Sequence, residues 1–224
     1  MAKLTLQELE STLWQCADIL RGELTGAEYK DYIFGMLFLK RLNDEFDEER
    51  EARKKEFLED GLEEDEIEEL LEDASIYETF FVPEQARWSK LKDLTLNIGP
   101  ELDKAFKAIE DEPKNSELVS VLSTTNYNDK EKVPDKKLSQ LLILFNSINL
   151  ANSNLESEDM LGDAYQYLIK QFADQGGKKG GEFYTPTEVV KIITNILKPQ
   201  EGDRIYDPTC GSGGMFVQAA RYMH

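Results

Sequence analysis

The chain has little of the chemistry that most metal sites and nucleophilic sites use. Among its 224 residues are two cysteines, Cys16 and Cys210, far apart in the sequence, and one histidine, His224. This spacing offers no structural zinc site and is typical of a protein kept in a reducing, cytoplasmic setting. A single histidine at the last position also leaves no histidine-based acid–base catalysis within these residues.

Long apolar runs are missing as well. The longest, residues 33–39, is far shorter than the roughly 20 residues that a helix needs to span a bilayer. The first five residues lead directly into a charged amphipathic pattern, which is unlike a cleavable signal peptide. We therefore expect neither a membrane partner nor a secretory route.

Positive charge is scarce, and the negative charge is unevenly spread. The net charge is −19, and the segment Asp44–Asp73 alone carries 17 acidic and 4 basic residues, or −13. Residues 151–224 carry 10 acidic and 7 basic residues, or −3. A uniformly acidic surface would repel nucleic acid, but a local patch leaves contact elsewhere open. No basic footprint is present, so if nucleic acid is the substrate, we expect another subunit or a missing segment to supply most of the grip.

The first 150 residues or so predict helices almost throughout. Thr5 with Glu8, and Thr25 with Glu28, fit the capping box that begins a helix. Apolar residues at helical spacing, broken by Pro83, Gly99-Pro100 and Pro113, then predict helices at 6–20, from 29 past 43, at 102–109, at 138–150 and at 158–172. We predict a helical N-terminal domain over residues 1–153.

The pattern changes after the glycine-rich segment 174–181, which composition favours as a flexible connector over a gating loop. Residues 187–197 predict a helix with Val189, Ile192, Ile193, Ile196 and Leu197 on its buried side. Residues 204–206 predict a short strand, and a further helix begins near Gly213. Helix, strand, glycine turn and helix in this order indicate the beginning of an α/β doubly wound, Rossmann-like fold over residues 154–224.

Two strings carry the chemistry of this second domain. The later one, residues 207–214, reads Asp-Pro-Thr-Cys-Gly-Ser-Gly-Gly. At the end of a parallel strand, Asp207 would accept from an ammonium group, and the glycines would let the backbone approach a nucleoside. No lysine follows Gly214, which rejects a P-loop, and Phe216 replaces the last glycine of a dinucleotide fingerprint. A structural turn without a ligand remains the alternative.

The earlier string, residues 181–186, reads Gly-Glu-Phe-Tyr-Thr-Pro. Thr185, Pro186 and Glu188 fit a capping box with proline at the first helical position. The positive end of that helix would attract a carboxylate, such as that of a methionine moiety. Phe183 and Tyr184 would offer aromatic faces to a sulfonium or an adenine. The alternative here is a well-made helix start and nothing more.

Together with Tyr29–Ile33, Leu39–Leu42, Phe81–Pro83, Ala86–Trp88 and Gly162–Tyr165, these strings identify a resemblance over nearly the whole chain. The chain resembles the N-terminal portion of the modification (methyltransferase) subunit of a type I restriction-modification system. The resemblance implies S-adenosylmethionine as cofactor, no metal, and DNA as substrate. It also implies a specificity subunit, a restriction subunit and a second modification subunit as partners. The residues implied to bind the cofactor are Glu182, Phe183, Tyr184, Thr185, Pro186, Thr187, Asp207, Thr209, Cys210, Gly211, Ser212 and Gly213.

The chain departs from the family's pattern in its catalytic motif. The string Asn/Asp-Pro-Pro-Tyr/Phe, which would hold a flipped adenine, is absent, and no two prolines are adjacent. Its absence upstream also excludes the permuted methyltransferases. A cytosine-C5 enzyme would need a Pro-Cys pair, whereas Cys16 follows a glutamine and Cys210 a threonine. We expect a truncated chain that is inactive by itself, with its catalytic residues and the acid for the cofactor ribose beyond His224.

The sequence therefore predicts a subunit that, when intact and partnered with a specificity subunit, transfers a methyl group from S-adenosylmethionine to adenine N6 in DNA. Two rival interpretations remain. A protein-glutamine methyltransferase also acts on a planar nitrogen group, although the long helical domain disfavours it. A non-catalytic interaction module would dock a protein or DNA partner, or dimerise, through its acidic helices.

Overall fold

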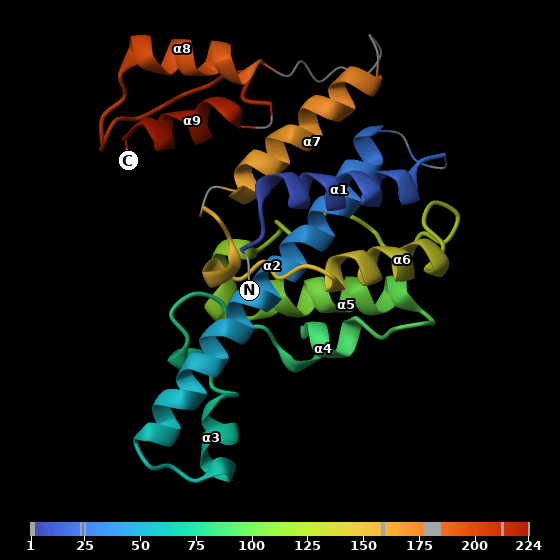
Figure 1. Ribbon diagram of the computed structural model, residues 1–224, viewed down its shortest axis with the longest axis vertical. Coiled ribbons are helices and arrows are strands. Elements are labelled where there is room, and N and C mark those ends of the chain that lie inside the picture. The colour runs from blue at the N-terminus through green and yellow to red at the C-terminus, as the bar shows by residue number, and fades with distance from the viewer. Residues whose placement is uncertain are drawn as a thin grey trace. The chain divides into compact units, whose positions relative to one another are not determined.

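The computed structural model describes residues 3–22, 24, 26–157, 160–176, 185–211 and 213–223. The chain divides into two compact units, Met1–Ala164 and Tyr165–His224, each described by itself below. The helices of the described residues, drawn in Figure 1, are α1 (Leu6–Leu20), α2 (Gly26–Glu59), α3 (Glu64–Leu70), α4 (Trp88–Leu91), α5 (Ile98–Asp111), α6 (Asp135–Asn146), α7 (Met160–Gly176), α8 (Thr187–Leu197) and α9 (Gly214–Met223). Short 3-10 helices lie at Ala74–Ile76, Glu84–Ala86, Pro113–Leu118 and Asn152–Asn154.

The N-terminal unit is helical, as predicted, but the described part of the chain contains no β-strand. The only extended backbone pairings among the described residues are two isolated bridges, Leu4 with Leu155 and Arg21 with Leu24. Residues 203–207 have no regular secondary structure, so the strand predicted at 204–206 is not formed. A strand exists only through hydrogen bonds to a neighbouring strand, and the described residues provide none. The Rossmann-like start therefore stays a prediction.

The first capping box is confirmed. Thr5 Oγ1 accepts a hydrogen bond from the Glu8 backbone N–H at 3.3 Å, and Glu8 Oε2 accepts from the Thr5 N–H at 2.9 Å. The Thr5 N–H, and the Thr5 hydroxyl that donates to the same Oε2 at 2.8 Å, favour the charged carboxylate and lower the pKa of Glu8. The second expected box falls on Thr25, which lies outside the described residues. The reciprocal bonds explain why α1 begins at Leu6.

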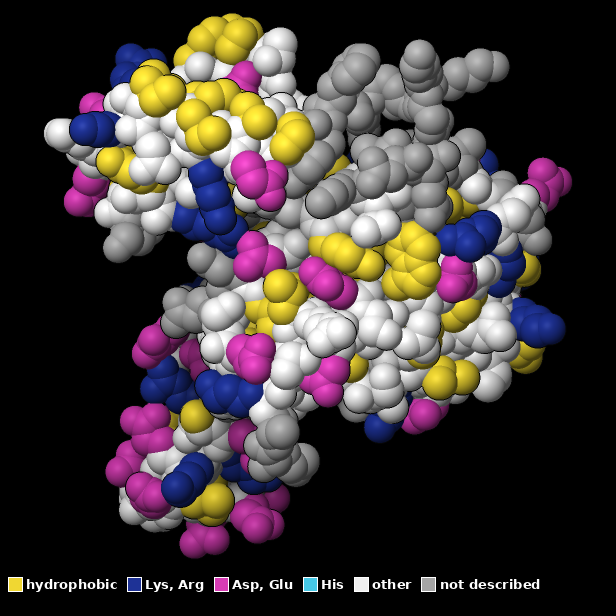
Figure 2. Space-filling model, turned by 45° about the horizontal axis from the view of Figure 1, so that its top comes forward, with side chains coloured by type: hydrophobic (Ala, Val, Ile, Leu, Met, Phe, Trp, Pro, Cys, Tyr) yellow, Lys and Arg dark blue, Asp and Glu magenta, His cyan; other side chains and the backbone are white. Residues whose placement is uncertain are grey.

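Helix α2 is a single helix of 34 residues whose first half is mostly buried and whose second half is highly charged. Its first half is buried on most sides, and Ile33, Met36 and Leu39 have no solvent exposure. This half packs against α1 and α6. Its second half is highly charged and runs beside α3 (Figure 1), where Arg50 binds Glu68 and Glu72, each at 3.0 Å. The acidic segment Asp44–Asp73 thus contributes to a hairpin of α2 and α3, with magenta side chains over its surface in Figure 2.

Asn43 ties the short elements that follow α3 to α2. Its amide Nδ2 donates to the carbonyls of Leu39 at 2.9 Å and Ala86 at 3.2 Å, and its Oδ1 accepts from the Trp88 backbone N–H at 2.6 Å. The residue is fully buried. A buried amide with both ends bonded holds a loop in one place, since any other arrangement would leave polar groups unpaired.

The segment after α6 is held to α2 by charge. Predicted as helix to Leu150, it leaves the helix at Asn146, and Asp44 Oδ2 accepts from the Leu150 backbone N–H at 2.7 Å. Lys40 and Asp44 form a largely buried ion pair. Burial raises the pKa of the Asp44 carboxyl, and the Lys40 charge opposes that rise. Turning back at Asn146 lets the chain satisfy this carboxylate.

Tyr127 packs in the core of the N-terminal unit, although it lies between the helices predicted at 102–109 and 138–150. Its side chain is fully buried, its hydroxyl donates to the Tyr32 carbonyl at 2.8 Å, and its ring stacks on Phe106 at 5.1 Å. Two glycines make the room. A Cβ at Gly35 would lie 2.1 Å from the Tyr127 hydroxyl oxygen, and one at Gly99 would lie 2.2 Å from its carbonyl oxygen.

The substitution Gly35→Ala should destabilise the N-terminal unit by about 1–3 kcal/mol, because the added methyl group overlaps a fully buried ring that cannot move freely. Guanidinium unfolding followed by tryptophan fluorescence measures this, since Trp14 and Trp88 both lie in this unit. In the Gly35→Ala/Tyr127→Phe double variant the hydroxyl is gone, so the loss should be smaller than the sum of the two single losses. Strict additivity would contradict the described contact.

Candidate functional site

The start of α8 lies directly after the first motif. Pro186 is its N-cap residue, with φ −53° and ψ 138°, and the Pro186 carbonyl accepts from the Val189 and Val190 N–H groups at 2.9 and 3.1 Å. The predicted box of Thr185 and Glu188 is not formed. Because proline carries no side-chain acceptor, no N-cap side chain covers the first turn of α8.

A residue that the sequence analysis missed contacts this helix start. Gln166 of α7 lies with its Oε1 3.4 Å from the Thr187 hydroxyl, which donates to it. The two residues are 21 positions apart, and both lie in the C-terminal unit. Neither periodicity nor a motif pointed to Gln166; its polar character amid the apolar positions of α7 was the only signal.

The second motif is folded around Asp207. Its Oδ1 accepts from the Thr209 backbone N–H at 2.9 Å and from the Thr209 hydroxyl at 3.3 Å. Both bonds fall on one carboxylate oxygen and close a local turn. The carboxylate therefore organises the turn in which it lies.

The glycines of this motif have a conformational role beside the predicted one. Gly211 and Gly213 have φ values of 52° and 77°, a region that glycine enters without strain. The Gly213 N–H donates to the Cys210 carbonyl at 2.8 Å, and α9 begins at the next residue. A side chain at Gly214 would meet no atom within 4 Å, so the backbone there is open to an approaching group.

Helices α8 and α9 pack together and bring the two motifs to one end of the pair. They run the same way in Figure 1, and the extended residues 203–207 return between their ends in the opposite direction. Thr185, Pro186 and Thr187 therefore share an end with Asp207, Thr209, Cys210, Gly211 and Gly213. Glu182, Phe183, Tyr184 and Ser212, and most of the glycine-rich segment, lie outside the described residues.

The prediction of which side of α8 is buried is wrong. Ile192, Ile196 and Leu197 are 60%, 73% and 73% exposed, whereas Val190 and Thr194 are buried. Val189 is also exposed, and Tyr206 in the returning segment is largely so. Figure 2 shows hydrophobic side chains gathered on this unit (upper left). The face has the composition of a buried surface, yet among the residues that the structure describes no strand lies beside it to cover it.

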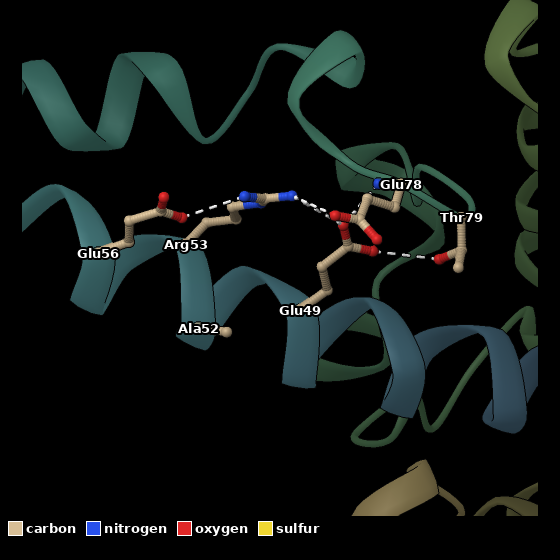
Figure 3. A pocket seen from close by; sticks show the side chains of 6 residues that line it. All are labelled: Glu49, Ala52, Arg53, Glu56, Glu78 and Thr79. Carbon is tan, nitrogen blue, oxygen red and sulfur yellow. Dashed lines mark hydrogen bonds and ion pairs between the residues drawn. The ribbon is translucent and has the colours of Figure 1, made fainter.

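A hollow of about 280 Å³ in the N-terminal unit is a poor candidate for a ligand site. It is lined by Glu49, Ala52, Arg53, Glu56, Glu78 and Thr79 (Figure 3). Arg53 binds Glu56 at 3.0 Å and Glu78 at 3.1 Å, and Glu49 accepts from the Glu78 N–H and the Thr79 hydroxyl. These polar groups already bind one another. Their contacts hold residues 78–79 against α2.

Within the described residues, no three histidine, cysteine, aspartate or glutamate side chains gather as a possible metal site. Among the described helices, none has both the length and the apolar character needed to cross a bilayer.

Comparisons with known proteins place the chain in a family. The profile of the HsdM N-terminal domain matches residues 9–145, and that of the N-6 DNA methylase family matches residues 156–224. The chain belongs to the methylase subunits of type I restriction-modification systems. The predicted resemblance is thereby confirmed. The two matched ranges follow the predicted order of a helical domain and a methylase domain, while the boundary at residues 153–154 remains a prediction.

Curated relatives agree along most of the chain. The type I restriction enzyme MjaIX methylase subunit of Methanocaldococcus jannaschii is 31% identical over 222 residues, covering 95% of this chain and 39% of the relative. The MpnII methylase subunit of Mycoplasma pneumoniae is 29% identical, covering 96% of this chain and 44% of the relative. The chain therefore spans about two-fifths of the length of these relatives.

A solved structure supports the fold. The crystal structure of a type I restriction-modification system methyltransferase subunit from Streptococcus thermophilus superposes with a TM-score of 0.73 at 27% sequence identity. The match covers 98% of this chain and 50% of that chain.

The two cysteines should differ sharply in reactivity. Cys210 is exposed in the second motif, whereas Cys16 is fully buried in α1, and burial raises the pKa of its thiol to about 12. Since the thiolate is the reactive form, Ellman's reagent should modify one thiol promptly near neutral pH and the second only after unfolding. Cys210→Ser should remove the prompt reaction and Cys16→Ser should preserve it. Prompt modification of the Cys210→Ser variant would show that α1 is not packed as described.

Proposed function

We propose that this chain supplies the helical domain and the first part of the S-adenosylmethionine site of an adenine-N6 DNA methyltransferase subunit. The observation that carries the proposal is the pair α8 and α9, whose starts lie at one end and follow the two motif strings. The N-6 DNA methylase match over residues 156–224 supports the same assignment.

The described residues suit parts of this cofactor. The first turn of α8, with no N-cap side chain over it, presents backbone N–H groups to a carboxylate. Asp207 keeps Oδ2 for an ammonium group, because both bonds within its turn fall on Oδ1. The open backbone at Gly214 admits a nucleoside. The bound cofactor would supply the methyl group, and Phe183 and Tyr184 are proposed to face its sulfonium or adenine.

The reaction and the partners follow as proposals from the family. The intact subunit would transfer the methyl group to adenine N6 in DNA, in the cytoplasm, with catalytic residues outside residues 1–224, since the chain lacks an Asn/Asp-Pro-Pro-Tyr/Phe string. A specificity subunit would choose the sequence, and a restriction subunit and a second modification subunit would complete the assembly. The names of the relatives favour this reading over a glutamine methyltransferase or a non-catalytic module.

Asp207→Ala in the intact subunit, assembled with its specificity subunit, should raise the dissociation constant for S-adenosylmethionine about 10- to 100-fold. A hydrogen bond to a charged group contributes about 1.5–3 kcal/mol, and 1.4 kcal/mol corresponds to a factor of ten. Transfer of labelled methyl groups to adenine N6 should fall in parallel at limiting cofactor, and calorimetry measures the affinity directly.

Asp203→Ala provides a matched control. Asp203 also organises a local turn, where its Oδ2 accepts from the Gln200 N–H at 2.8 Å, and it lies four residues before Asp207. We expect this variant to bind the cofactor as the wild type does. Equal losses in both variants would contradict a specific role for Asp207, and label on protein instead of DNA would overturn the proposed substrate.

A further inference from the structure

We infer that Gln166 of α7 is a positioning residue for the cofactor site, acting through the Thr187 hydroxyl; this inference rests on the proposed function. The Thr187 hydroxyl donates to Gln166 Oε1, and the contact is partly buried. No motif includes Gln166, which lies outside both predicted strings.

The chemistry of the hydroxyl explains why its partner matters. A threonine hydroxyl has one hydrogen and two lone pairs. When the hydrogen is directed at Gln166, the side-chain rotamer of Thr187 is fixed, and with it the position of the hydroxyl oxygen at the start of α8. Gln166 can serve because its amide oxygen accepts, whereas a lysine or arginine at this position would offer only donors.

The position of Thr187 in α8 makes this bond a support for the helix start as well. Thr187 is the first helical residue, and its N-cap, Pro186, provides no side-chain cap. Helix ends without a cap tend to fray. A bond from α7 to the first residue of α8 therefore holds the first turn of α8 within the C-terminal unit.

The bond length is consistent with a site that tightens on binding. At 3.4 Å the two oxygens are farther apart than in a typical O–H···O bond, whose usual separation is about 2.7–2.8 Å. Functional hydrogen bonds are often long before the ligand binds and shorten in the complex. We therefore expect the effect of Gln166 mainly in cofactor affinity, with little change in the rate at saturation.

The test uses the intact subunit with its specificity subunit, S-adenosylmethionine as the probe, and four variants. Gln166→Leu removes the acceptor, and Gln166→Glu keeps an acceptor oxygen. Thr187→Val removes the donor, and Gln171→Leu is the control on the same helix. Gln166→Leu should raise KM for S-adenosylmethionine about three- to tenfold with kcat unchanged, as expected for one lost hydrogen bond. Gln166→Glu should restore KM to within about twofold of the wild type.

The double variant Gln166→Leu/Thr187→Val decides whether Gln166 acts through Thr187. If it does, Gln166→Leu has no further effect once Thr187 is valine. Independent, multiplying effects would overturn the inference, as would equal losses in Gln166→Leu and Gln171→Leu. If the wild type binds the cofactor and Gln166→Leu binds it equally well, the inference is refuted and the proposed function stands. A wild type that binds no cofactor refutes the proposed function and the inference with it.

Discussion

The N-terminal unit depends on one constraint: its irregular segments must satisfy their backbone groups although its described residues form no β-sheet. Long stretches between α3 and α6 run outside helices, yet their chain is packed into the core. Buried side-chain amides take the place of a sheet. Asn43 bonds to residues 86 and 88, and Asn115 bonds to both backbone groups of Phe81 and to the Ile109 carbonyl. Because an unpaired buried polar group costs about 1–3 kcal/mol, these contacts define the path of the chain.

The sequence predicted those features of the fold that residues close together in the chain determine. The capping box at Thr5 followed from helix-start chemistry, and the continuity of α2 and the bounds of α8 followed from the spacing of apolar residues. The burial of Tyr127 could not be predicted in this way. It depends on Gly35 and Gly99, which lie 92 and 28 residues earlier in the chain. A single sequence does not show that two glycines make room for one distant ring.

The candidate site shows the same limit. Its two strings and their glycines were visible in the sequence, because turns and helix starts are encoded by neighbouring residues. The contact of Gln166 with Thr187 was not visible, since it joins two helices across a connection whose path the sequence leaves open. The strand at 204–206 failed for a related reason. A strand requires a partner, so apolar character alone predicts only the capacity to pair.

The exposed aliphatic face of α8 and the unpaired residues 204–206 both bear on the proposed cofactor site. Burying one large aliphatic side chain is worth about 1.5–3 kcal/mol, and Ile192, Ile196 and Leu197 all lie largely in solvent. A parallel sheet beside α8 would cover them and would also give residues 204–206 their missing partners. Asp207 would then lie at the end of a true strand, where ligands bind in such sheets. In such a sheet, burial of this face would stabilise the same arrangement that places Asp207 at a strand end, so the packing of α8 and the proposed cofactor site would depend on one another.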